Sequence, residues 1–292
     1  MILIGESINV MSKTLRPAMR NRDAEPIQKM AIAQQKAGVD YHDLNIGPAK
    51  RGGPEMMAWL VETIQEVSDR PLFLDTSNVE AMEAGLQAHK GQAVINSISC
   101  RPERMEALLP LVPKYDAAFV GLLIGTEGIP RDADERAMLA AEMQAQMAVH
   151  DITEVRVFFD PIVLPVSSQQ DQLQSCTEFM MMIKDMVPGC RITCGLSNVS
   201  NGAPKELRPI LDQTYLAMLL KFGIDSAIVN AFEKELVDIG KGRRDDILQA
   251  VQRVMDGEDV DTSGMSQELA DYVKTTQVLM GQSLYSHSWL KL

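Results

Sequence analysis

Short apolar runs that end in polar side chains recur along the chain, and most are followed by a longer amphipathic stretch. Runs of this length are typical of buried strands, and amphipathic stretches bounded by a cap residue and by Gly or Pro are typical of helices. The predicted strands cover residues 3–8, 41–46, 71–76, 93–97, 117–123, 155–160, 192–197 and 226–231. The predicted helices between them cover residues 25–37, 54–67, 78–88, 102–109, 132–149, 170–186 and 207–222.

Eight such units predict an α/β fold, a (β/α)8 TIM barrel, because strands that alternate with helices pair in parallel through right-handed crossovers. The spacing between units varies and their letters do not repeat, so only the architecture is repeated. After the eighth strand a charged tract at 241–246 opens a helix to about Met255, and an acidic turn precedes a last helix over 266–284. We expect one barrel domain over residues 1–292 with an extra C-terminal helical segment.

Composition narrows the class of protein. The 292 residues are 46% hydrophobic but only 5% aromatic, and 19 are Met, so aliphatic and thioether side chains must fill the core. A net charge of −12 argues against nucleic-acid binding. No apolar run reaches the ~18 residues of a membrane span, the N-terminus does not resemble a signal peptide, and the four cysteines form no paired framework. We therefore expect a protein of the reducing cytoplasm.

The ends of the predicted strands carry mostly carboxylates and carboxamides. In a TIM barrel these ends meet at the mouth that holds the active site. The polar residues there are Glu6, Asn9, Asp43, Asn45, Asp75, Thr76, Asn78, Asn96, Ser97, Asp160, Ser197, Asn198 and Asn230. Because an isolated buried carboxylate is costly, this mouth requires a metal ion or a ligand rich in N–H groups.

The positions of the histidines argue against a metal ion at this mouth. His42 directly precedes Asp43 in a strand and should point to the opposite face, and the other three histidines lie near helix ends or in the tail. Cys190 and Cys194 lack the second pair of ligands that a structural zinc site needs. We expect no metal on this chain, with a hard cation held by carboxylates as the alternative. A pterin ring fits better, since its amino group and ring N–H form a flat two-donor edge for a carboxylate, and its other ring atoms suit a carboxamide.

Six stretches resemble the motifs of the pterin-binding methyltransferases, in order and spacing over nearly the whole chain. They are Gly5-Glu6-Ser7-Ile8-Asn9, Asp43-Leu44-Asn45-Ile46-Gly47, Leu74-Asp75-Thr76-Ser77-Asn78, Ile95-Asn96-Ser97, Asp160-Pro161 and Gly195-Leu196-Ser197-Asn198-Val199-Ser200. The chain is most similar to the methyltetrahydrofolate:corrinoid protein methyltransferases and less so to the folate module of cobalamin-dependent methionine synthase.

The resemblance implies roles for individual residues. Asp75, Asn96 and Asp160 would hold the pterin, and Asn198 would hydrogen-bond N5, the atom that bears the methyl group; Asn198, Asp160 and Asp75 are the expected catalytic set. The remaining expected substrate-binding residues are Gly195, Ser197, Asp43, Asn9, Glu6 and Arg208. Asp43 and Asn45 could equally tie strand ends to loops, and Asn78 is expected to cap a helix. Arg208 could support the glutamyl or aminobenzoate end of folate or only pack the helix start.

The implied reaction moves a methyl group between tetrahydrofolate and the cobalt of a corrinoid. N5 needs a proton or a strong hydrogen bond as its bond to carbon breaks, and a carboxamide can give the second but not the first, so the proton would come from solvent. Asp40-Tyr41-His42 approaches a cobalamin-ligand signature but lacks its glycine and lies in a strand. The cobalamin should therefore arrive on a corrinoid protein as partner.

Other implications of the resemblance stay open. The family implies a homodimer and anaerobic one-carbon metabolism, and the segment 237–265 departs from its shortest members, which leaves the partner and the direction of transfer undecided. Dihydropteroate synthase is an alternative, although the last two strand ends carry no Lys or Arg for a diphosphate. A tetrahydromethanopterin-dependent methyltransferase and a non-enzymatic pterin-binding scaffold are the others.

Overall fold

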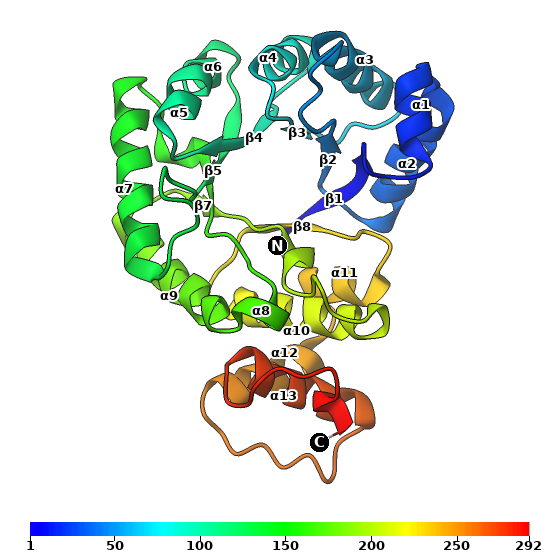
Figure 1. Cartoon of the computed structure of the whole chain (residues 1–292). Helices are drawn as coiled ribbons and strands as arrows, with labels where there is room; N and C mark the ends of the chain where they lie inside the picture. Colours follow the sequence, from blue (N-terminus) through cyan, green and yellow to red (C-terminus); the bar gives the residue numbers. More distant parts are fainter. Residues whose placement is uncertain (292) are drawn as a thin grey trace.

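A computed structural model describes residues 1–291 and contains a parallel eight-stranded sheet curved into a barrel (Figure 1). The sheet order is β7-β6-β5-β4-β3-β2-β1-β8, so neighbours in sequence are neighbours in space. The strands are β1 Ile2–Asn9, β2 Tyr41–Asn45, β3 Leu72–Asp75, β4 Val94–Ser99, β5 Ala118–Leu122, β6 Val157–Asp160, β7 Arg191–Ile192 and β8 Ser226–Val229. The predicted (β/α)8 TIM barrel is confirmed.

Helices form the outer ring of Figure 1. They are α1 Leu15–Asn21, α2 Ala24–Ala37, α3 Gly53–Gln65, α4 Val79–Ala88, α5 Pro102–Leu108, α6 Leu111–Lys114, α7 Ala133–Val149, α8 Val166–Gln169, α9 Asp171–Met186, α10 Arg208–Lys221, α11 Lys234–Gly240, α12 Asp245–Met255 and α13 Gln267–Leu279. Short 3₁₀ turns add η1 Glu154–Arg156, η2 Leu196–Asn198, η3 Lys205–Leu207 and η4 Trp289–Lys291. The periodicity did not predict α1, α6, α8 and α11, which are too short to show an amphipathic pattern.

Two predicted boundaries were wrong. The last helix ends at Leu279 rather than at residue 284, because Gly281 adopts a left-handed conformation with φ of 73° that stops the helix. Strand β7 ends at Ile192 rather than at residue 197, because the chain then turns into η2. The barrel closes through single hydrogen bonds, including Ile228 N–H to the Cys194 carbonyl at 2.8 Å.

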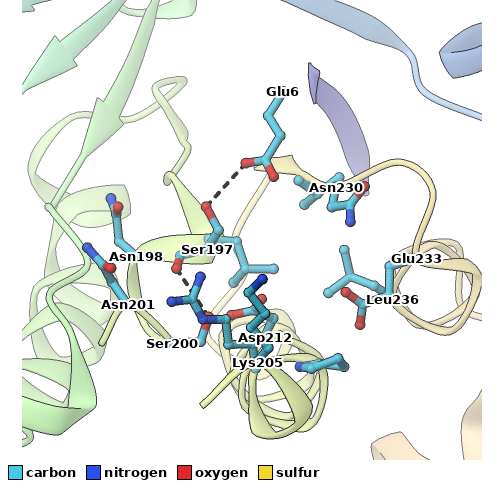
Figure 2. A pocket seen from close by; sticks show the side chains of 14 residues that line it. Glu6, Ser197, Asn198, Ser200, Asn201, Lys205, Asp212, Asn230, Glu233 and Leu236 are labelled. Atoms are coloured by element: carbon cyan, nitrogen blue, oxygen red, sulfur yellow. Dashed lines mark hydrogen bonds between the residues drawn. The ribbon is translucent and has the colours of Figure 1, made fainter. Parts of the chain in front are cut away.

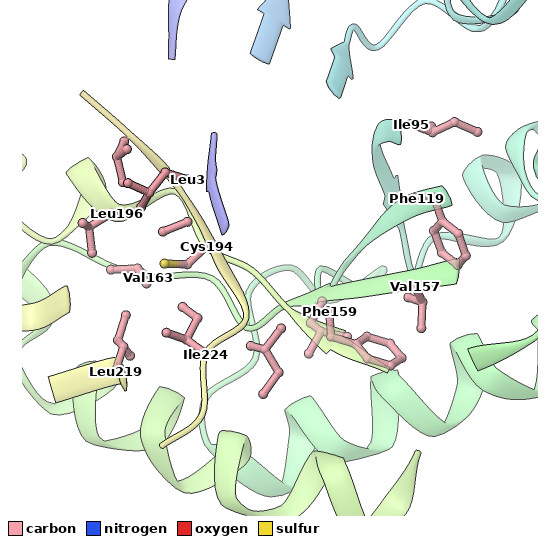
Figure 3. Packing of buried hydrophobic residues seen from close by; sticks show 14 of the residues in the cluster. Leu3, Ile95, Phe119, Val157, Phe159, Val163, Cys194, Leu196, Leu219 and Ile224 are labelled. Atoms are coloured by element: carbon pink, nitrogen blue, oxygen red, sulfur yellow. The ribbon is translucent and has the colours of Figure 1, made fainter. Parts of the chain in front are cut away.

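Alternation along the strands divides the core into two layers. The barrel interior is filled by a small cluster of Ile4, Phe73, Val94, Ala118, Val120 and Phe158. The rings of Phe73 and Phe158 lie 5.7 Å apart, edge to face. The larger cluster lies between strands and helices and includes Leu3, Phe119 and Phe159 (Figure 3). The interior layer closes the barrel below its mouth, so a ligand at the mouth rests on an apolar floor.

His42 points outward into the helical layer, as its position next to Asp43 predicted. Its side chain is fully buried, Nδ1 lies 2.8 Å from Gln34 Oε1, and Nε2 lies 2.9 Å from Ser68 Oγ. Burial lowers the pKa of His42 to about 4, so the ring is neutral and structural.

The C-terminal helices lie outside the ring of strands. α12 and α13 pack against α10 and against each other, around a small core of Ala250, Val254, Val260 and Val273 (Figure 1). The tail is held to the barrel by Gln170, whose amide donates to the carbonyls of Val278 and Ser283. In residues 1–291, no helix has both the length and the apolar character needed to cross a membrane.

Candidate functional site

Strand alternation directs the acidic and amide side chains into the mouth of the barrel. Glu6, Asp75, Asn96 and Asp160 each follow by two positions an apolar residue of the interior layer, and residues two apart on a strand share a face. Those apolar residues are Ile4, Phe73, Val94 and Phe158. The mouth is thus lined with polar groups on top of an apolar floor.

Two carboxylate–carboxamide pairs join three neighbouring strands. Asn96 Nδ2 donates to Asp43 Oδ1 at 3.0 Å, and Asn45 Nδ2 donates to Asp75 Oδ2. Burial raises the pKa of Asp75 to about 6, against the hydrogen bond from Asn45. Burial and the charge of Asp75 raise the pKa of Asp43 well above its ordinary value. No cation pairs with either carboxyl group among residues 1–291, and the Asp75 carboxylate keeps acceptor capacity for a ligand.

Asp160 ends β6 in a tightly held turn. Its Oδ1 accepts the Ile162 backbone N–H at 2.8 Å, and Ile162 has a left-handed φ of 66°, an unfavourable conformation for a β-branched residue. Burial raises the pKa of Asp160 to about 6, opposed by the Ile162 N–H and by the charge of Arg136. The second carboxylate oxygen is free to accept from a ligand.

A cavity of about 550 Å³ lies over the ends of β7, β8 and β1. Ser197 Oγ and Glu6 Oε2 face each other across it at 3.2 Å (Figure 2). Asp212 of α10 also lines this cavity, and burial raises the pKa of Asp212 to about 7, against a hydrogen bond from Ser200. Burial also raises the pKa of Glu6. This part of the mouth holds protonatable carboxyl groups.

Asn198 lies in the same cavity with an exposed side chain. Figure 2 shows it next to Asn201, on the side of the cavity away from Glu6 and Asn230. Gly195 makes room for it, because a Cβ at Gly195 would stand 3.1 Å from Asn198 Nδ2. No hydrogen bond engages the Asn198 carboxamide within residues 1–291, so both its donor and its acceptor can reach a ligand.

Three other predicted residues make local contacts. Asn9 Oδ1 accepts the Met11 N–H at 2.8 Å and so shapes the turn after β1. Asn78 accepts the Ala81 N–H at 3.0 Å, which confirms its expected role as the cap of α4. Arg208 Nε donates to the Ala203 carbonyl at 3.1 Å and also lines the large cavity, so its contacts suit either expected role.

A family comparison identifies the class to which this arrangement belongs. The family model described as "Pterin binding enzyme" matches residues 5–230. The chain belongs to the pterin-binding enzymes. This membership confirms the resemblance found in the motifs at the strand ends.

Among relatives of this pterin-binding enzyme, a protein of Eubacterium limosum named methylcorrinoid:tetrahydrofolate methyltransferase is 28% identical over 239 residues, which cover 81% of this chain and 88% of that protein. The methionine synthases of Mycobacterium leprae and Mycobacterium tuberculosis are 28% and 29% identical over 246 residues, and the chain spans about a fifth of each (20%). A dihydropteroate synthase of Stenotrophomonas maltophilia shares the fold, with a TM-score of 0.63, 16% identity, and coverage of 87% of this chain and 93% of that one.

The predicted residues do not all line one cavity. Asp75 and Asn96 line a cavity of about 320 Å³ over β3 to β5, whereas Glu6, Ser197, Asn198 and Arg208 line the larger one. Asp160 lines neither, but β6 lies between these two groups of strands in the sheet order. A flat ligand across the barrel axis would meet both groups, with Asp160 between them.

Sequence reasoning missed several groups at the mouth of this pterin-binding enzyme. Asp212 follows Arg208 by four residues on α10, a spacing that puts both on one helix face and could have revealed it. Lys205 lines the same cavity, and Arg101 and Arg104 line the smaller one. These cations come from loops and helices, whereas the sequence prediction considered only residues at the ends of strands.

For a metal, the donor set is poor. No cluster of three or more His, Cys, Asp or Glu side chains with a geometry suited to a metal ion occurs in residues 1–291. All four cysteines are buried thiols. Asp43 and Asp75 pair with carboxamides, Glu6 with a hydroxyl and Asp160 with a backbone N–H, and such acceptors suit a ligand that offers N–H groups.

Proposed function

We propose that this chain transfers a methyl group between N5 of tetrahydrofolate and the cobalt of a corrinoid carried by a partner protein. The name of the Eubacterium limosum relative, which this chain matches over 88% of its length, supports the two substrates. The similarity to part of the methionine synthases supports the same class of methyl transfer.

The observation that carries the proposal is the set of half-buried acceptors at the mouth. Asp75 and Asp160 each keep an unshared carboxylate oxygen above an apolar floor, with Asn96 nearby. A pterin presents an amino group and a ring N–H along one edge, and its flat ring can lie on the interior layer. Asp75, Asn96 and Asp160 would thus hold the ring, while Gly195, Ser197 and Glu6 would border its N5 side.

Asn198 would act on the reacting nitrogen. In the direction from folate to corrinoid, the bond between N5 and the methyl carbon breaks, the carbon bonds to cobalt(I), and N5 keeps the electron pair and takes a proton from solvent. The Asn198 amide N–H would donate to N5, a hydrogen bond that strengthens as charge develops and contributes about 2 to 4 kcal/mol by analogy with oxyanion-hole donors. Its freedom from other contacts suits this task.

The corrinoid is proposed to arrive on another protein. His42, the residue nearest to a cobalamin-ligand signature, is fully buried between Gln34 and Ser68 and faces away from the mouth. It is therefore unsuited to bind cobalt. We also propose that segment 237–265 is a family-variable insertion in one domain and that the enzyme is a cytoplasmic homodimer; size-exclusion chromatography with light scattering tests the dimer.

The test is a spectroscopic assay of the purified protein with methylcob(III)alamin and tetrahydrofolate. Formation of cob(I)alamin, together with 5-methyltetrahydrofolate in equal amount, supports the proposal. No cob(I)alamin at any enzyme concentration, despite measurable folate binding, would refute it.

The dihydropteroate synthase fold provides the competing hypothesis, since Lys205 and Arg208 line the large cavity. Incubation with a dihydropterin diphosphate and 4-aminobenzoate decides between them. Release of diphosphate would favour the synthase, and we expect none, because the segments directly after β7 and β8 present neutral side chains such as Ser197 and Asn230 to the cavity.

A further inference from the structure

Arg136 on α7 is a fully buried arginine, with no exposed surface. Its Nε donates to the Pro161 carbonyl at 2.7 Å, and its Nη1 donates to Ser175 Oγ at 2.6 Å and to the Asp132 carbonyl at 3.0 Å. Its Nη2 donates to Gln172 Oε1 at 3.1 Å. The guanidinium thus ties α7 and α9 to the segment directly after β6.

All four of these acceptors are neutral. No carboxylate lies within ion-pair distance of Arg136 in the described part of the chain, 1–291. Burial of an ionised guanidinium without a counter-charge is costly, and a neutral side chain could make several of the same contacts more cheaply. A structural role alone therefore does not explain the charge.

Asp160 is the carboxyl group at the mouth on which the charge of Arg136 acts. It directly precedes Pro161, whose carbonyl Arg136 holds, and the positive charge of Arg136 lowers the pKa of the Asp160 carboxyl against the effect of burial. The other titratable groups beside Asp160 are the thiols of Cys176 on α9 and Cys194 after β7. Burial raises the pKa of both thiols, that of Cys176 to about 11, so both are neutral and Arg136 provides the charge that acts on Asp160.

The hydrogen bond from Arg136 to the Pro161 carbonyl also helps to hold the unfavourable backbone conformation of Ile162. Ile162 has a left-handed φ of 66°, and this conformation aims its N–H at Asp160 Oδ1. The Cys176 thiol donates to the Ile162 carbonyl at 3.1 Å, and Arg136 holds the preceding carbonyl. Together they fix residues 160–162 from the rear, on the side away from the mouth.

We propose that Arg136 is a positioning residue for pterin binding: it fixes the segment 160–162 and keeps the Asp160 carboxylate ionised, and thus able to accept two N–H groups from the ligand. The proposal rests on the proposed function, in which Asp160 holds the pterin. Arg136 lies on the outer helix α7, is fully buried, and acts on the ligand only through Asp160.

The sharpest test changes the charge but keeps the shape. Gln172→Glu places a carboxylate where Nη2 of Arg136 now meets an amide oxygen at 3.1 Å, and so neutralises the guanidinium without removing it. Affinity for 5-methyltetrahydrofolate is measured by calorimetry from pH 5.5 to pH 9. We expect the midpoint of the affinity loss to move upward by about one pH unit from about 6, with ~2-fold weaker binding at pH 7, ~8-fold weaker binding at pH 5.5 and nearly unchanged binding at pH 9.

Matched variants separate charge from packing. Ser175→Ala removes an Arg136 partner without a change in charge and should leave the midpoint in place. Arg136→Lys should keep the midpoint near that of the unmodified protein, whereas Arg136→Met should raise it. Since Asp75 titrates in the same range in every variant, a difference between variants reports on Asp160.

Two outcomes would overturn the proposal. They are an affinity loss of the same factor at every pH in Gln172→Glu, and a midpoint that does not move at all. An unmodified protein that binds no folate at any pH would instead refute the proposed function, so the two failures are distinguishable.

Discussion

The carboxylates at the barrel mouth and those in the C-terminal segment differ in their hydrogen-bond partners and in the direction of their pKa shifts. At the mouth, Asp43 is buried and Asp75 is half-buried, and both pair with carboxamides and have a raised pKa. In the segment, Arg244 binds Glu235, Asp246 and Glu268 at the junction of α11, α12 and α13, with Asp246 at 2.9 Å and Glu268 at 3.2 Å. The hydrogen bond from Arg244 lowers the pKa of Asp246.

The difference separates a binding surface from a structural joint. The acids around Arg244 are already satisfied by a cation and half exposed, at 49% for Asp246 and 55% for Glu268, so they need nothing from a ligand. Asp43 and Asp75 have no cation partner in residues 1–291, which reduces stability unless a ligand brings the missing donors. If this division between the two regions holds, substitutions at the mouth should change ligand binding and substitutions around Arg244 should not.

The largest effect is expected for Asn198→Ala. Loss of a hydrogen bond that strengthens only in the transition state should lower turnover by about 10²- to 10³-fold and change folate affinity by less than ~5-fold. Steady-state kinetics with methylcob(III)alamin and calorimetry measure the two quantities. The control is Asn201→Ala, beside Asn198 in the same cavity, which should keep its turnover. Equal losses of turnover and affinity in Asn198→Ala would make Asn198 a binding residue only.

The second-largest effect is expected for the folate affinity of Asp160→Ala, with Asp246→Ala as the control. Removal of a buried acceptor for two N–H groups should weaken folate binding by about 100-fold, since charge-assisted pairs contribute about 3 kcal/mol. Asp246→Ala should leave the affinity unchanged, because its carboxylate serves Arg244. Calorimetry measures both. An unchanged affinity in Asp160→Ala would remove Asp160 from the site, and a loss in Asp246→Ala would break the division between the regions.

A smaller effect is expected from pH. Because the raised pKa values of Asp75 and Asp160 are both about 6, these carboxylates accept N–H groups above that pH and become protonated below it. Folate affinity should fall by about 10-fold or more as the pH is lowered from 7 to 5.5. The fall should be shallower in Asp160→Asn, which keeps only the titration of Asp75. A flat profile in the unmodified protein would contradict the assigned acceptors.

The smallest effect concerns stability. The pKa of Asp212 is raised from 3.8 to about 7, so the folded state binds more protons than the unfolded one between these values. Its contribution to the free energy of unfolding therefore decreases as the pH rises through about 7, and Asp212→Asn should stabilise the protein at pH 8 by on the order of 2 kcal/mol.

The pKa of Asp246 is shifted in the opposite direction to that of Asp212. Its lowered pKa contributes stability at neutral pH that is lost as the pH falls through the depressed value, and because the pair is half exposed, Asp246→Asn should cost less than about 1 kcal/mol. Urea unfolding at pH 5 and pH 8 measures both variants. Stabilisation by Asp246→Asn, or destabilisation by Asp212→Asn at pH 8, would contradict the comparison.

Much of the fold and of the site could be predicted from local sequence. Alternation of short apolar runs with amphipathic helices predicted eight strands in order, and the residues at their ends, such as Asp75 and Asn96, do line the mouth. The position of His42 next to Asp43 was enough to predict its outward direction. These features follow from periodicities of 2 and 3.6 residues, which local sequence determines.

Other features are decided by groups far apart in the sequence. The pairing of Asn96 with Asp43 spans 53 residues, and only the sheet order makes them neighbours. The end of β7 at Ile192 was mispredicted because Cys194 and Leu196 are apolar, yet the chain leaves the sheet there to place Ser197 and Asn198.

The sequence by itself therefore determined the barrel and the polar character of its mouth, because both depend on the spacing of residue types along each strand and helix. Only the tertiary structure decided which carboxylates lack a cation, that Asp212 joins the mouth from α10, and that Arg136 of α7 stands behind Asp160. The physical reason is that the burial and pairing of a charge depend on everything packed around it, and these groups come from distant parts of the chain, such as Arg136 and Pro161, which are 25 residues apart.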